Sequence, residues 1–156
     1  MRKAFTMIEI IFVIVIIGII AAVAIPKLAA SRNDATASLC AYEVGQLVHE
    51  IGNSYNKEGY TKFKDLTIED ISNIATSVTE DENGILENAN TKLDMVGVTY
   101  YCAGEAVVKI VCNIQGSEYN LTIEDKNPTT PVGVGAEEKL IKQNIVIAGS
   151  LRQYGL

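Results

Sequence analysis

The feature that most constrains this chain is the stretch from Ile10 to Ile25, which contains no polar side chain. Counted from Phe5, the mostly apolar segment is 21 residues long. As an α-helix it would extend about 31 Å, close to the roughly 30 Å thickness of a bilayer's hydrocarbon core. The sequence therefore predicts a membrane-spanning helix near the N-terminus.

The rest of the chain has the composition of a soluble domain. The protein has 156 residues, enough for one domain and an anchor, and a formal net charge of −6. Its basic residues form no patch interleaved with aromatic residues, so we expect no specific nucleic-acid partner. The sequence also shows no nucleophile–base pair, phosphate-binding loop or metal-ligand spacing, which argues against an enzyme. We interpret the single histidine, His49, as a surface residue of a helix.

The charges that flank the apolar segment do not by themselves fix its orientation. Arg2 and Lys3 precede it and two basic residues follow it, so the positive-inside rule is nearly balanced. Only four residues precede Phe5, however. We therefore expect the short N-terminus to stay inside and the large C-terminal part to cross the membrane.

Glu9 is the one charged residue within the predicted span. A carboxylate in a membrane helix is costly and usually has a partner. Glu9 could reach the headgroup level and remain solvated, as an ordinary residue near the end of a span does. It could instead be a charge that is kept for a partner subunit. The residue alone does not decide between these interpretations.

The whole N-terminal string is more specific than Glu9 alone. A short basic leader, an aromatic residue, a glutamate and an uninterrupted apolar run follow in fixed order: Lys3-Ala4, Phe5-Thr6-Met7-Ile8-Glu9, then Ile10 to Ile25 with Gly18, and Pro26. This arrangement closely resembles the signature of type IV prepilins, the family of type IV pilins and of the pseudopilins of type II secretion. The resemblance covers about the first 30 residues, and the remainder is similar to the family only in general layout.

The resemblance implies a defined maturation. It implies cleavage between Ala4 and Phe5, followed by methylation of the new Phe5 amine. The family usually has glycine before the cut, and because alanine is the next smallest side chain we expect slower or tolerated cleavage after Ala4. In the family, the residue that matches Glu9 pairs with the N-terminal amine of a neighbouring subunit. Opposite charges attract strongly in a low-dielectric filament core, and each would be costly there without the other.

Gly18 and Pro26 match positions between which the helix of the family can loosen on assembly. Pro26 has no N–H to donate to the Ala22 carbonyl, so a bend there is expected without any family argument. Gly18 could equally be a place where two membrane helices pack closely.

The resemblance also implies partners and a location. The expected partners are copies of the chain itself and related pilin subunits, a prepilin peptidase/methyltransferase, an inner-membrane assembly platform and membrane lipid. The expected location is the bacterial inner membrane, crossed once with a periplasmic C-terminal domain, or a cell-surface filament in the case of a true pilus. The sequence does not distinguish a secretion pseudopilus from a surface pilus, nor a major from a minor subunit.

With this resemblance, we expect the chain to divide into a leader (residues 1–4), a membrane span (5–26) and a periplasmic or extracellular α+β domain (56–156). The span continues to about residue 55 as an amphipathic helix, because apolar side chains recur there every three or four positions: Ala37, Cys40, Val44, Leu47, Ile51 and Tyr55. Gly59 is expected to stop this helix.

Beyond the helix, residues 56–95 are expected to form a loop with one short helix, where Thr67 to Asp70 resembles a capping box. From there the period changes to two, which predicts strands over Val96–Cys102, Ala106–Ile114 and Glu118–Glu124. A loop (Asn127–Gly135), a helix (Ala136–Gln143) and a last strand (Ser150–Tyr154) complete the prediction. The predicted fold class is α+β and pilin-like, with the long N-terminal helix packed on a small antiparallel sheet.

The three cysteines allow at most one internal disulfide. An exported domain lies in an oxidising compartment, where a disulfide is favoured. Cys102 and Cys112 close a short loop and are the first expectation, although a simple hairpin register does not place them opposite each other. A bond from Cys40 to either of them is the competing pairing, and all three could also be reduced residues of the core.

The segment from Thr79 to Gly84 is acidic and turn-forming. Crowded oxygen ligands before a glycine could bind calcium, and some pseudopilins are stabilised by calcium. The spacing does not fit an EF-hand, and a solvated loop has the same composition. No other cofactor is expected.

Residues Glu118 to Thr122 match the extended acidic form of the N-glycosylation sequon that some bacteria use. Asn120 would then carry the glycan, on the outward side of its strand. Matches of this length also arise by chance.

Two functions from different classes fit these observations. The first is a structural subunit that a prepilin peptidase cleaves and that polymerises into a type II secretion pseudopilus or a type IV pilus. The second is a periplasmic binding domain on an uncleaved signal anchor that never polymerises. Glu9 and the short basic leader favour the first.

Overall fold

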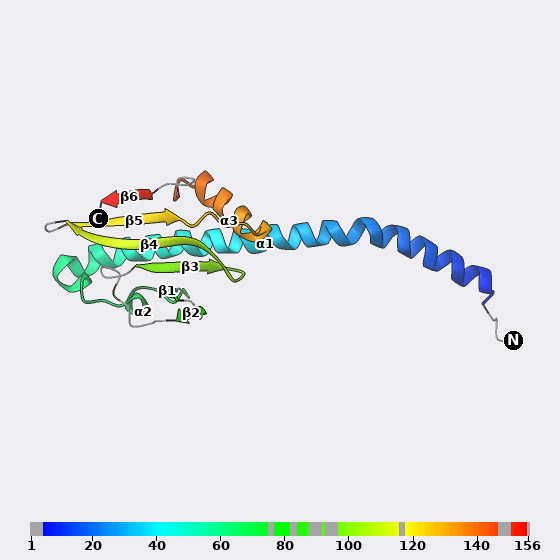
Figure 1. Cartoon of the computed structure of the whole chain (residues 1–156), viewed down its shortest axis with the longest axis horizontal. Helices are drawn as coiled ribbons and strands as arrows, with labels where there is room; N and C mark the ends of the chain where they lie inside the picture. Colours follow the sequence, from blue (N-terminus) through cyan, green and yellow to red (C-terminus); the bar gives the residue numbers. More distant parts are fainter. Residues whose placement is uncertain are drawn as a thin grey trace.

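The computed structural model describes residues 5–74, 77–81, 84–87, 92, 97–115, 118–146 and 151–155. One long helix, α1 (Met7–Phe63), runs the length of the molecule. Its C-terminal half lies against a body of strands and short helices, while its N-terminal half extends away from that body (Figure 1). The arrangement therefore separates a bare apolar helix from a packed domain.

The C-terminal half of α1 is amphipathic, as predicted. Its buried side chains include Ala37, Cys40, Val44, Leu47 and Ile51. Regular helix geometry is interrupted at Gly59, where φ is 70° and ψ is 166°, a backbone conformation that favours glycine.

The helical segment runs further than the predicted end near residue 55, and it resumes after Gly59 to end at Phe63. Phe63 is buried and its ring packs edge-on against Tyr55, with ring centroids 5.4 Å apart. Burial of this aromatic side chain explains why the chain makes another turn after the glycine.

Six strands form one antiparallel sheet with the order β2-β1-β3-β4-β5-β6. Their bounds are β1 (Ser77–Asp81), β2 (Gly84–Glu87), β3 (Val98–Cys102), β4 (Glu105–Gln115), β5 (Glu118–Asp125) and β6 (Leu151–Gly155). The strands predicted at β3, β4, β5 and β6 are confirmed. The loop predicted over 56–95 is wrong where β1 and β2 form a hairpin, because these short segments gain their ladder partners from each other and from β3.

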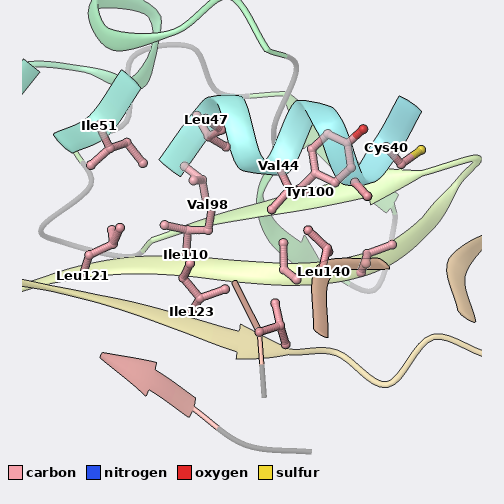
Figure 2. Packing of buried hydrophobic residues seen from close by; sticks show 14 of the residues in the cluster. Cys40, Val44, Leu47, Ile51, Val98, Tyr100, Ile110, Leu121, Ile123 and Leu140 are labelled. Atoms are coloured by element: carbon pink, nitrogen blue, oxygen red, sulfur yellow. The ribbon is translucent and has the colours of Figure 1, made fainter. Parts of the chain in front are cut away.

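The core lies between α1 and one face of the sheet. Figure 2 shows Val44, Leu47 and Ile51 of α1 directed toward strand residues that are at most 3 % exposed, among them Val98, Tyr100, Ile110, Leu121 and Ile123. A short helix, α2 (Ile68–Ile71), adds two buried isoleucines to the core. It begins at the predicted capping box, in which Asp70 accepts hydrogen bonds from the Thr67 amide (2.9 Å) and hydroxyl (2.8 Å).

A third helix, α3 (Pro131–Lys142), crosses beside the middle of α1 (Figure 1). The predicted loop over Asn127–Gly135 is wrong from Pro131 onward, because α3 begins five residues before the predicted start at Ala136. Thr130 caps it by accepting a hydrogen bond from the Gly133 amide at 3.1 Å, and proline is favoured at the first helical position. A Cβ placed on Gly135 would lie 3.1 Å from the Cβ of Ala37, so glycine lets α3 approach α1 closely.

Candidate membrane anchor and assembly site

The N-terminal half of α1 is apolar on all sides and uncovered. Every large apolar side chain from Phe5 to Leu28 is exposed, from 40 % at Ile16 to 83 % at Met7. A helix that is hydrophobic all round belongs in lipid or among other helices rather than in water. By length and composition α1 could cross a membrane, and it is therefore a candidate anchor.

The first turn of α1 is closed by a capping box made by Thr6 and Glu9. Oε2 of Glu9 accepts hydrogen bonds from the Thr6 amide at 2.8 Å and from the Thr6 hydroxyl at 2.6 Å. In return, the Thr6 hydroxyl oxygen accepts a 3.4 Å hydrogen bond from the Glu9 amide. The Glu9 carboxylate thus satisfies amide donors at the start of its own helix.

This local role of Glu9 is a third interpretation, beyond the solvated residue and the partner charge considered from the sequence. A threonine three residues before a glutamate, followed by an apolar run, is the known pattern of a capping box. The pattern was therefore readable in Thr6-Met7-Ile8-Glu9. Within the part of the chain that the structure describes, Oε1 of Glu9 accepts no hydrogen bond and faces no cation.

The expected processing position lies just outside the helix. Phe5 is not helical and is 80 % exposed, and Thr6 has extended backbone angles of −76° and 148°. Ala4 lies outside the described residues. The described side of the expected cleavage position, Phe5 and Thr6, therefore lies outside α1.

Gly18 and Pro26 both lie inside α1. α1 bends within the half that extends from the body toward the N-terminus (Figure 1), and Pro26 belongs to this half of the helix. This agrees with the expected effect of a missing N–H at a proline. A Cβ placed on Gly18 would meet nothing within 4 Å, so nothing within the single chain requires glycine there.

The disulfide joins Cys40 of α1 to Cys102 of β3, and their Cα atoms are 5.8 Å apart. The first expectation, a bond between Cys102 and Cys112, is wrong, and the competing pairing through Cys40 is confirmed. In the ladder of β3 and β4, Cys102 lies opposite Glu105 at the turn, while Cys112 lies beyond Ile110 at the other end of β3. Cys112 is buried outside the disulfide.

A hydrogen bond adds a second tie between α1 and β3. The Tyr100 hydroxyl donates to Oε2 of Glu43 at 2.5 Å. Burial raises the pKa of Tyr100, and the hydrogen bond to the Glu43 carboxylate raises it further, so the hydroxyl keeps its proton. The disulfide and this hydrogen bond together hold β3 at a fixed position along α1, near Cys40 and Glu43.

The Glu105 carboxylate joins the β3–β4 turn to the start of α3. Oε1 accepts hydrogen bonds from the Thr129 amide (2.7 Å) and hydroxyl (2.9 Å), and Oε2 accepts from the Thr130 amide (3.0 Å) and hydroxyl (2.5 Å). These donors, with the Thr130 hydroxyl contributing most, lower the pKa of Glu105 to about 2. A Cβ placed on Gly133 would lie 2.3 Å from Oε2, so glycine leaves room for the carboxylate.

The remaining predicted sites are placed only in part. Among the described residues, no group of three or more His, Cys, Asp or Glu side chains could hold a metal ion. The calcium prediction at Thr79–Gly84 falls on side chains outside that description.

Asn120 is half-buried on β5, between Asn113 of β4 and Gly155 of β6, and its glycosylation remains a prediction. His49 is exposed on α1, with Nδ1 3.0 Å from the Asn53 amide nitrogen.

No protein-family model, curated protein or solved structure matches this chain.

Proposed function

We propose that this chain is a filament subunit similar to type IV pilins and type II secretion pseudopilins. In this proposal the N-terminal half of α1 anchors the precursor in the inner membrane with the body outside the cytoplasm. A prepilin peptidase then cleaves between Ala4 and Phe5, and the mature chain polymerises through α1. The observation that carries the proposal is the bare apolar half of α1, which begins in a carboxylate-bearing turn and continues into the helix that supports the body.

The exposed apolar surface supports polymerisation because it can be covered in two equivalent ways. Lipid covers it in the membrane, and the same halves of neighbouring copies would cover it in a filament. Transfer from one apolar environment to the other leaves little hydrophobic free energy to overcome. A charged group at the start of the helix is then the feature that can specify how neighbours are aligned.

Glu9 suits this alignment because half of its carboxylate is already held in place. Thr6 fixes Oε2, and within the described residues Oε1 has no donor. Cleavage before Phe5 would create an amine near the membrane surface of each copy. A positively charged amine of one copy and the carboxylate of the next would compensate each other in the apolar filament interior.

The disulfide supports a body outside the cytoplasm. Disulfides persist in oxidising compartments and are rare in the cytosol of mesophiles. The bond between Cys40 and Cys102 lies in the part of the protein that would be exported. It also fixes the body to α1, so that a polymer of helices would carry the body in one defined orientation.

The second candidate function is an anchored domain that does not polymerise. The capping box favours it, because a Glu9 that caps its own helix needs no partner subunit. The mature N-terminus separates the two functions. Intact mass measurement on protein from native membranes should give residues 5–156 with one added methyl group. A chain that still carries residues 1–4 would refute the filament proposal and support the uncleaved anchor.

A further inference from the structure

Outside the membrane span, the body covers its large apolar side chains well. Among the described residues beyond Leu28, large apolar side chains are exposed at Leu39, Tyr42 and Val134. Leu39 is 56 % exposed and Tyr42 is 65 % exposed, and both lie on α1, three residues apart. A single exposed leucine is ordinary. Two large apolar residues side by side on one helix face are a candidate contact surface.

Leu39 and Tyr42 point away from the body. At about 100° per residue, they lie on the side of α1 opposite the buried stripe. That stripe is formed by Ala37, Cys40, Ala41, Val44 and Leu47, all at most 7 % exposed. The body therefore leaves this outer face of the helix open for another molecule.

The outer face continues toward the membrane with regular spacing. Steps of alternately three and four residues lead back from Tyr42 through one face of α1: Leu39, Ala35, Arg32, Leu28, Ile25, Ala21 and Gly18. We call the part outside the span, Leu28, Arg32, Ala35, Leu39 and Tyr42, the α1 seam. Alternating steps of three and four are the spacing of helices that pack along one another in coiled coils. The same steps beyond Tyr42 reach polar residues, Gln46, His49 and Asn53, so the apolar part of the face ends there.

Lipid cannot cover the end of the seam that is formed by Leu39 and Tyr42. Tyr42 lies 14 residues after Leu28, or about 21 Å further along the helix, which is outside the hydrocarbon core. A second copy in the same membrane would have the same orientation and level. Its seam would meet the seam of the first copy residue by residue, as in a symmetric pair. Small residues at Ala35, Ala21 and Gly18 would allow the two backbones to approach.

We propose that two membrane-resident copies of this chain pair in parallel through the α1 seam, before and independently of any filament. Arg32 is the charged residue of the seam, and a single charged or polar core position sets register in parallel helix pairs at a cost in stability. Its long side chain can extend sideways into water. Because a charged position within the seam lowers the stability of the pair, the resulting dimer is weak and reversible. The proposal depends on anchoring by residues 5–26 and not on polymerisation.

The test uses the full, unprocessed chain in dilute phosphatidylethanolamine/phosphatidylglycerol vesicles, without peptidase or assembly proteins. Leu39→Cys and Tyr42→Cys are oxidised mildly and separated on non-reducing gels. Val134→Cys is the matched control, because Val134 is also exposed and neighbours Gly135, which packs at the level of Ala37. We expect cross-linked dimers to form at least about tenfold faster at the two seam positions, because paired thiols react at a high effective concentration.

A second measurement does not depend on cysteines. In chains labelled on the body, energy transfer between copies should be lost on Leu39→Glu and kept on Val134→Glu. Because Leu39 is exposed, the change should leave folding intact, which the Cys40–Cys102 disulfide reports. Equal cross-linking at all three positions would overturn the proposal, as would cross-linking found only in assembled filaments. Dimers in vesicles together with an uncleaved native N-terminus would instead refute the filament function and leave the dimer standing.

Discussion

Cys40 of α1 and Cys102 of β3 are joined across 62 positions of sequence, with their Cα atoms 5.8 Å apart. The bond ties the middle of the long helix to the sheet that covers it. Because the helix is also the membrane anchor, this bond connects the body to the anchor covalently at a second place in the chain.

Removal of this disulfide should destabilise the body strongly. A loop of this length is worth about 4 kcal/mol in the chain-entropy account. Denaturant unfolding of Cys40→Ser with Cys102→Ser should therefore show a lower midpoint than the wild type, and a reductant should lower the wild-type midpoint to a similar extent. Cys112→Ala is the matched control, because this variant keeps the disulfide and its unfolding midpoint should still fall when reductant is added. Equal wild-type midpoints with and without reductant would contradict the prediction.

Glu105 should make the stability of the body depend on pH in the acid range. Its pKa is held near 2 in the folded chain, below the ordinary value of 4.5. A lowered folded pKa means that the contribution is complete above about pH 4.5 and is lost as the pH falls toward 2. The stability difference between wild type and Glu105→Gln should be largest near neutral pH and shrink over that range. Thermal melts at several pH values test this, and a difference that is constant with pH would exclude the role.

The elements marked by periodicity were predictable from the sequence. The buried stripe of α1 and the strands β3, β4 and β5 follow from period-3.6 and period-2 patterns that burial imposes. β1 (Ser-Val-Thr-Glu-Asp) and β2 (Gly-Ile-Leu-Glu) are short segments without a clear alternation of apolar and polar residues, and they pair with each other as a hairpin. The attachment of β1 to β3, at Ser77 and Thr99, is long-range, and neither strand sequence contains it.

Two local features are present in the sequence but were not part of the prediction. Thr6–Glu9 has the same capping-box spacing as Thr67–Asp70, and both boxes form in the structure. The start of α3 lies within the segment predicted as a loop, because that segment contains Pro128 and Pro131, although proline is favoured at the first helical position. In the structure Gly133 makes room for Glu105, and Gly135 makes room for Ala37.

Gly133→Ala should therefore destabilise the body, against the usual gain from replacing a helical glycine. The new Cβ would lie 2.3 Å from Oε2 of Glu105 and 2.7 Å from the Cβ of Pro128. Gly52→Ala in α1 is the matched control, since its Cβ would meet nothing within 4 Å, and it should stabilise by about 0.5–1 kcal/mol. Unfolding midpoints that move in the same direction for both variants would contradict the packing argument.

The two roles of Glu9 can be separated because glutamine serves in a capping box as well as glutamate does. Glu9→Gln keeps the hydrogen-bonding partner for Thr6 and removes the charge, whereas Thr6→Val removes the hydroxyl and keeps the charge. If Glu9 pairs with the Phe5 amine of a neighbour, Glu9→Gln should lower filament yield by at least about tenfold, because a buried amine loses its counter-charge. Thr6→Val should then have the smaller effect, through a looser first turn.

The measurement is the yield of sheared filaments from wild type and both variants, at matched membrane levels and with the cleaved N-terminus verified by mass. Body folding is checked through the Cys40–Cys102 disulfide, which joins the C-terminal half of α1 to β3 and is therefore far from the first turn of the helix. If Glu9 acts only as a helix cap, the order reverses: Glu9→Gln would assemble normally and Thr6→Val would be the weaker variant. Full yield from Glu9→Gln would therefore remove the pairing role and leave the capping box as the sole function of this carboxylate.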